Sequence, residues 1–129
     1  MRDLVKYLLR IEKMASDLYQ DASAFFSKDK DLAAFLRRLQ ADEMRHFQLM
    51  TEADAYLQGK AEETPAFVRL DDSAREKIER PFVENRELLL ANTLSKDDII
   101  NLIVTTLTLR APGLSIRRLP LFVWMVFIN

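Results

Sequence analysis

Two residues whose spacing suits metal binding lie in the first half of the chain, within residues 39–50. Glu43 precedes His46, the only histidine among the 129 residues, by three positions. If the segment is helical, residues three apart lie on the same face, so both side chains can reach one ion. A Glu-x-x-His pair that faces the interior of a helical bundle is the repeated unit of carboxylate-bridged di-metal sites. The pair therefore predicts a metal site, provided that it faces the core and that a further ligand approaches it.

The apolar pattern places this pair on the inner face of a helix predicted for residues 30–58, with Gly59 in the position of a C-cap. A surface pair or a core histidine without metal is the competing interpretation, and the inward position argues against the first of these. The stripe advances in steps of three and four residues, and its members are Leu32, Phe35 or Leu36, Leu39, Glu43, His46, Met50 and Leu57.

A first helix is predicted for residues 2–26, and its apolar stripe includes a carboxylate. Glu12 follows Leu8 by four positions and precedes Ala15 by three, so it shares their face. A carboxylate at an inward position is unexpected unless another group compensates its charge. Residues 27–29 are a polar break, after which Asp29 or Asp31 could cap the next helix.

If these two helices fold back as an antiparallel hairpin at residues 27–28, Glu12 lies opposite Glu43, each ~23 Å from the turn. Three residues of ligand type then converge at one level. Tyr19 lies on the same face ~10 Å nearer the turn, where it could act as a redox neighbour or pack in the core with its hydroxyl hydrogen-bonded. Glu12 could instead form a buried ion pair with an arginine such as Arg45, without metal.

Composition favours one all-α domain. Two glycines and four prolines are too few for a loop-rich β fold, and helix-forming residues are abundant. The net charge of −1 provides no electrostatic basis for binding nucleic acid or an anionic membrane. The absence of cysteine excludes disulfides, thiol nucleophiles and cysteine-ligated zinc. No signal peptide is visible at the start of the sequence, so a cytoplasmic location is expected.

The second half is predicted to add helices to the hairpin. Residues 59–72 are a polar linker, and Ser73 could cap a helix that passes Pro81 and ends near residue 92. Ser95 and Asp98 match a capping box before a helix over residues 96–110. The apolar side of this helix consists of Ile99, Leu102, Ile103, Thr106 and Leu107. The acidic residues Glu84, Glu87 and Asp98 are expected to be solvated or to cap a helix, and not to bind metal.

Residues 111–129 form an apolar tail, because no acidic residue follows Asp98 and residues 119–128 are almost entirely apolar. This run is shorter than the ~20 residues that a membrane-spanning helix needs. A buried strand, a segment that packs on the core, a subunit interface and a shifted reading frame all remain open as interpretations. The predicted organisation is therefore a hairpin (1–58), a linker (59–72), further helices (73–110) and the tail.

At Glu12, Tyr19 and the tetrad Glu43-Met44-Arg45-His46, the chain resembles the ferritin-like superfamily, particularly rubrerythrin-type di-iron domains. The resemblance covers the first 60 residues. It implies an antiparallel helical hairpin extended by one or two further helices, an incomplete or atypical four-helix bundle. It also implies Glu12, Glu43 and His46 as ligands of iron, with manganese or zinc as alternatives. Such sites oxidise ferrous iron or reduce peroxide.

The chain departs from that family because it lacks the second ligand set. A further glutamate would be expected near Thr106 or Leu107, and no second histidine exists. A homodimer in which each chain supplies one ligand set, similar to the encapsulated ferritins, would complete a di-iron site, with an electron-donor protein as a further partner. The alternative is a non-catalytic helical protein that associates through its apolar tail. No Ser-His-Asp set or phosphate-binding glycine loop is present.

Overall fold

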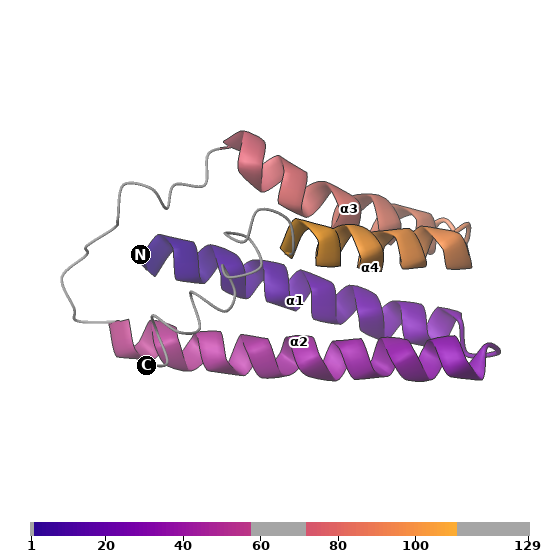
Figure 1. The fold of residues 1–129 in the computed structure, drawn as a ribbon, viewed down its shortest axis with the longest axis horizontal. Helices are drawn as coiled ribbons and strands as arrows, with labels where there is room; N and C mark the ends of the chain where they lie inside the picture. The colour runs from indigo at the N-terminus through magenta and orange to yellow at the C-terminus, as the bar shows by residue number, and fades with distance from the viewer. Residues whose placement is uncertain (1, 58–71, 111–129) are drawn as a thin grey trace.

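The computed structural model describes residues 2–57 and 72–110, and within them the fold is all-α, as predicted (Figure 1). The predictions for the linker up to residue 71, including Gly59, and for the tail lie outside these residues. None of the helices in the described part of the chain is long and apolar enough to cross a membrane. The helices are α1 (Arg2–Phe25), α2 (Lys30–Leu57), α3 (Asp72–Leu90) and α4 (Lys96–Arg110).

The predicted antiparallel hairpin of α1 and α2 is confirmed, and its bounds match the expected ones to within one residue at each end. Residues 26–29 form the turn, in which the backbone N–H of Asp29 donates to the carbonyl of Phe26 at 2.9 Å. The backbone N–H of Leu32 donates to Oδ1 of Asp29 at 3.1 Å, so Asp29 is the N-cap of α2. The other carboxylate oxygen of Asp29 accepts from Lys96 Nζ at 2.8 Å, which attaches α4 to the same turn.

Asp29 is therefore expected to contribute more to stability than its half-buried position in a turn suggests. Asp29→Ala removes both the cap and the ion pair, and should lower the melting temperature by a few degrees. Asp29→Asn keeps a capping oxygen and should lose less, and Asp31→Ala, in the first turn of α2, should change little. Thermal unfolding followed by circular dichroism measures all three; equal losses for alanine at 29 and 31 would contradict the capping role.

The helices form a bundle around one main core. α1 packs along α2, α3 packs on α1, and α4 packs against α3. The apolar stripe predicted for α2 left open whether Phe35 or Leu36 faces the core. Leu36 is fully buried, whereas Phe35 is 41% exposed, so Leu36 is the core residue. Buried residues from every described helix or its flanking turn form the core, namely Tyr7, Ile11, Ala15, Leu18, Tyr19, Ala22, Leu32, Leu36, Phe82, Leu94, Ile99, Leu102 and Ile103.

The α3–α4 hairpin begins at Asp72, earlier than predicted, and α4 begins at Lys96, as predicted. α3 already includes Asp72, so Ser73 lies inside the helix and the prediction that it caps the helix is wrong. After α3 ends, Asn92 adopts a φ of 60°, the left-handed conformation that asparagine tolerates best among non-glycine residues. The predicted capping box of α4 is confirmed: Ser95 N–H donates to Asp98 Oδ2 at 2.9 Å, and Asp98 N–H donates to Ser95 Oγ at 3.0 Å.

Candidate metal site

The predicted convergence of Glu12, Glu43 and His46 is present in the structure. Glu12 is only 6% exposed on α1 and Glu43 only 4% exposed on α2, so two carboxylates lie between the helices of the hairpin. Each glutamate occupies a position on the apolar face of its helix. Because that face packs against the rest of the bundle, the glutamate side chain faces inward. The antiparallel register then sets them at one level. Their role as metal ligands stays a prediction.

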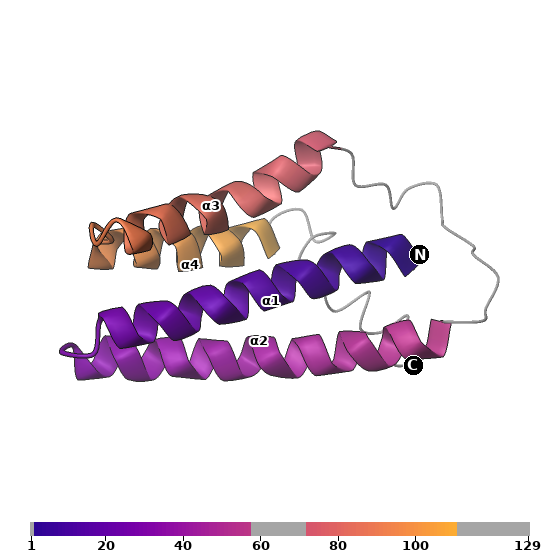
Figure 2. The same ribbon diagram turned by 180° about the vertical axis from the view of Figure 1, so that it is seen from behind.

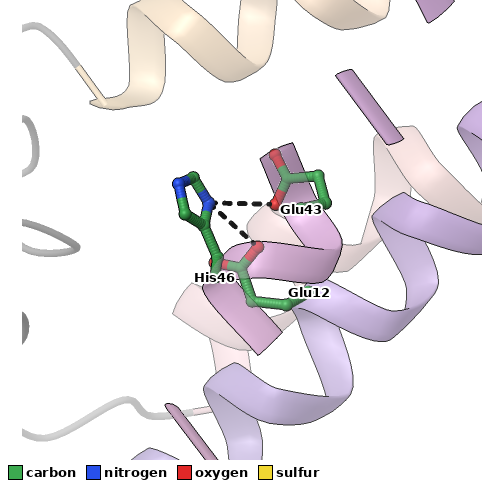
Figure 3. A group of neighbouring side chains, drawn as sticks. All are labelled: Glu12, Glu43 and His46. Atoms are coloured by element: carbon green, nitrogen blue, oxygen red, sulfur yellow. Dashed lines mark ion pairs between the residues drawn. The ribbon is translucent and has the colours of Figure 1, made fainter. Parts of the chain in front are cut away.

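His46 completes a compact group of three side chains, which we call the Glu–Glu–His trio (Figure 3). Its Nδ1 atom lies 3.7 Å from Oε2 of Glu12 and 3.5 Å from Oε2 of Glu43. Each residue offers one ligand atom, and the three atoms all lie within 4.8 Å of one another. Metal–oxygen and metal–nitrogen bonds of roughly 2.0–2.2 Å place ligand atoms of one ion about 3–4.4 Å apart. The three atoms could therefore hold one ion if the distances between them shortened by less than the length of a metal–ligand bond.

The two carboxylates raise the pKa of His46 from 6.5 to about 9, Glu12 having the larger effect and burial opposing it. At neutral pH the ring is thus an imidazolium in the ion-free protein, and its positive charge offsets part of the two negative charges. The distances of 3.5 and 3.7 Å exceed the 2.7–3.2 Å typical of N–H···O hydrogen bonds. His46 and the two carboxylates are therefore attracted mainly as an ion pair, in a site that is partly removed from solvent.

This shift predicts how the stability of the ion-free protein depends on pH. Because the folded state holds the His46 proton more tightly than the unfolded state, the stabilisation is complete below pH 6.5 and is lost as the pH rises through 9. The free energy of unfolding should fall by about 1–2 kcal/mol across this window, allowing for solvent screening. Urea unfolding at several pH values measures it. His46→Gln should remove that decline, and an identical decline in the variant would contradict the assignment.

The donor set determines which ions the trio suits. Two carboxylate oxygens and one imidazole nitrogen are typical ligands of Fe(II) and Mn(II), and zinc also accepts them. The two carboxylates together balance the charge of a divalent cation once the histidine proton has left. The side chain of His46 is 29% exposed, so the trio has an edge toward solvent. Arg45, the alternative partner of Glu12, lies on the exposed side of α2.

Tyr19 and Thr106 are the remaining positions that the sequence connects with this site. Tyr19 is 3% exposed and belongs to the main core, about two helical turns from Glu12. Thr106 is half-buried, and its hydroxyl donates to the carbonyl of Leu102 at 2.8 Å. In residues 2–57 and 72–110 the trio is the one group of three or more such side chains close enough to share an ion. The described part of one chain thus holds one ligand set.

A polar contact between α1 and α3 was not predicted from the sequence. The guanidinium of Arg75 lies 4.9 Å above the ring of Tyr7, whose hydroxyl donates to the Arg75 carbonyl at 3.3 Å. Burial, followed by the charge of Glu79, raises the pKa of Tyr7. Arg10 and Glu79 form an ion pair at 2.7 Å beside them. These residues line a cleft of about 430 Å³. No sequence signal links them, because the paired positions are 68 and 69 residues apart.

Comparison with known proteins adds no family assignment. No known family model matches the sequence. No solved structure matches the chain significantly. A function must therefore be inferred from the geometry and chemistry of the trio.

Proposed function

We propose that this chain is a ferritin-like, rubrerythrin-type metal-binding protein whose Glu–Glu–His trio binds iron. One observation supports the proposal: α1 and α2 together bring three potential ligand atoms within 4.8 Å of one another. Two of the three side chains are carboxylates almost completely removed from solvent. Burying two like charges side by side is costly, and binding a divalent cation would offset that cost.

Each residue of the trio has a distinct part in holding the ion. Glu12 and Glu43 supply anionic oxygens from facing helices, so an ion would join α1 to α2. His46 must give up its proton from Nδ1 before that atom can bind metal, and its exposed edge provides a route for the proton to reach solvent. Bound iron would supply the redox chemistry toward dioxygen or peroxide.

A homodimer would complete a di-iron site, because each chain would bring one Glu–Glu–His trio to a two-fold axis. In that assembly the proposed activity is oxidation of ferrous iron or reduction of peroxide. Tyr19 would serve as a redox-active neighbour ~10 Å from the trio, and an electron-donor protein would return the site to the ferrous state.

Anaerobic addition of two Fe(II) per dimer, followed by oxygen, tests this proposal. The expected result is a stable absorption band of protein-held ferric iron, which Glu43→Ala abolishes. Light scattering on the same sample should give the mass of a dimer. Protein that neither retains iron after purification nor takes it up under these conditions would refute the proposal, and a strict monomer would refute the shared site.

The second candidate is a non-catalytic helical protein that keeps the hairpin without its metal. One observation favours it: in the described part of the chain, α3 and α4 add no residue to the trio. In this case His46 serves only to neutralise two buried carboxylates. The absence of any metal-dependent change in unfolding temperature would select this candidate.

A further inference from the structure

A methionine lies one helical turn from the Glu–Glu–His trio, on the same face of α2. Met50 follows His46 by four positions, so their Cβ atoms lie about 6 Å apart. Side chains of an α-helix lean toward the N-terminus of that helix, so Met50 leans toward the turn that carries His46. Helix α2 thus places a soft, oxidisable thioether beside the trio.

The side chain of Met50 is enclosed by the hairpin. It is 4% exposed and forms a small buried cluster with Val5 of α1, against which Leu8 and Leu9 pack. Helices α1 and α2 lie side by side in both views (Figures 1 and 2), and this cluster joins them beyond the trio, on the side away from the turn at residues 26–29. An oxidant in bulk solvent therefore reaches Met50 poorly, whereas an oxidant held at the trio lies close to it.

The other two methionines of the described helices differ in both respects. Met14 and Met44 are half-buried. Met14 follows Glu12 by two positions, so it projects about 200° around α1 from that glutamate. Met44 follows Glu43 by one position, so it projects about 100° around α2. Exposure therefore favours oxidation of these two by dissolved peroxide, whereas the position beside the trio favours oxidation of Met50.

We propose that Met50 is the residue that hydrogen peroxide oxidises when the trio holds iron. The inference rests on the proposed iron binding, which would bring peroxide to the trio. A lone pair of the Met50 sulfur attacks one peroxide oxygen, an S=O bond forms and the O–O bond breaks. The second oxygen leaves as water with both protons, so the sulfur loses two electrons and the peroxide gains two. The product is methionine sulfoxide, which methionine sulfoxide reductases return to methionine.

Oxidation of Met50 would weaken the packing of the hairpin beyond the trio. The sulfoxide oxygen is polar, and the side chains around it, Val5, Leu8 and Leu9, offer no hydrogen-bond donor. The protein oxidised at Met50 should therefore melt at a lower temperature than the reduced protein. A sulfoxide at the half-buried Met14 or Met44 can be hydrated and should have a smaller effect.

Peptide mass spectrometry of the full-length protein tests the inference. The protein is loaded with Fe(II) and oxygen, its ferric absorption band is recorded, and excess iron is removed before hydrogen peroxide is added. A metal-free sample receives the same peroxide. We expect bound iron to accelerate sulfoxide formation at Met50 by at least about tenfold, and at Met14 and Met44 by less than about twofold. Trypsin cuts after lysine and arginine, which places the three methionines on separate peptides, residues 14–28, 39–45 and 46–60.

Three variants serve as controls. Glu43→Ala removes one atom of the trio, so Met50 should be oxidised at the metal-free rate even when iron is added. Glu52→Ala removes an exposed carboxylate of the same helix and should behave like the unmodified chain. Met50→Leu is close in volume and apolar; it should keep the ferric band and form no sulfoxide on the peptide of residues 46–60.

The ferric band separates failure of this inference from failure of the proposed function. A ferric band with equal acceleration at Met44 and Met50 would assign the oxidation to species that diffuse in solution, and a band without faster oxidation of Met50 would show that the trio does not direct peroxide there. Either result overturns the inference and leaves the iron binding in place. A sample that develops no band would refute the iron binding and the inference together.

Discussion

Replacing Glu43 by alanine is expected to lower the affinity for Fe(II) or Mn(II) by at least about 100-fold, since even residues that only orient a metal ligand affect affinity by 10–100-fold. Glu43 offers one of the three atoms that could hold an ion and is 4% exposed, so water would not readily take its place. The two remaining residues would hold an ion no better than many exposed carboxylate–histidine pairs. Anaerobic calorimetric titration measures the loss.

The control for that experiment is Glu52→Ala. Glu52 lies on the same helix, has the same charge and is exposed, so its removal changes the net charge equally without touching the trio. Its affinity should equal that of the unmodified chain. If both variants lost affinity to the same extent, the metal would be held by diffuse negative charge, and the assignment of the site to Glu43 would be wrong.

Replacing the whole trio by leucine is expected to have the opposite effect on stability. Glu12→Leu, Glu43→Leu and His46→Leu together should raise the free energy of unfolding of the metal-free protein by about 1–4 kcal/mol, as seen when buried charged groups give way to packed apolar residues. The positions already lie on apolar stripes, so leucine continues the pattern of its neighbours. Urea unfolding at neutral pH measures the gain.

This second result separates a site kept for function from a structural ion-pair network. If the trio existed to stabilise the hairpin, the triple variant would be less stable than the unmodified chain. A gain in stability with complete loss of metal binding would show that the charged residues are maintained at a cost to folding. The single variant Glu43→Leu is a useful companion, because it leaves Glu12 and His46 in place and should gain less.

The sequence allows much of the hairpin and the trio to be predicted. The apolar stripe of α2 assigns Glu43 and His46 to the interior, and the short polar turn sets the register that brings Glu12 opposite Glu43. These are local signals, because helix periodicity and turn position determine them within about 30 residues. The Asp29 cap and the Ser95–Asp98 capping box follow from equally local hydrogen-bonding rules.

The placement of α3 could not be predicted in the same way. Its contacts with α1 join Tyr7 to Arg75 and Arg10 to Glu79, across 68 and 69 residues. No periodicity connects residues so distant, and the outcome depends on which faces remain uncovered after the hairpin forms. The same limit explains Phe35, because the stripe allowed either Phe35 or Leu36 inside and only packing against the other helices selects Leu36.

Metal binding by the Glu–Glu–His trio can be tested with a crystal structure of the protein grown with Mn(II) or, anaerobically, with Fe(II). Anomalous scattering locates the ion without assumptions about its ligands. If the trio binds the ion, a peak is expected about 2.0–2.2 Å from one oxygen of Glu12, one oxygen of Glu43 and Nδ1 of His46. A chain in which Nδ1 still faces the two carboxylates with no peak between them, or in which the ion lies elsewhere, would contradict it.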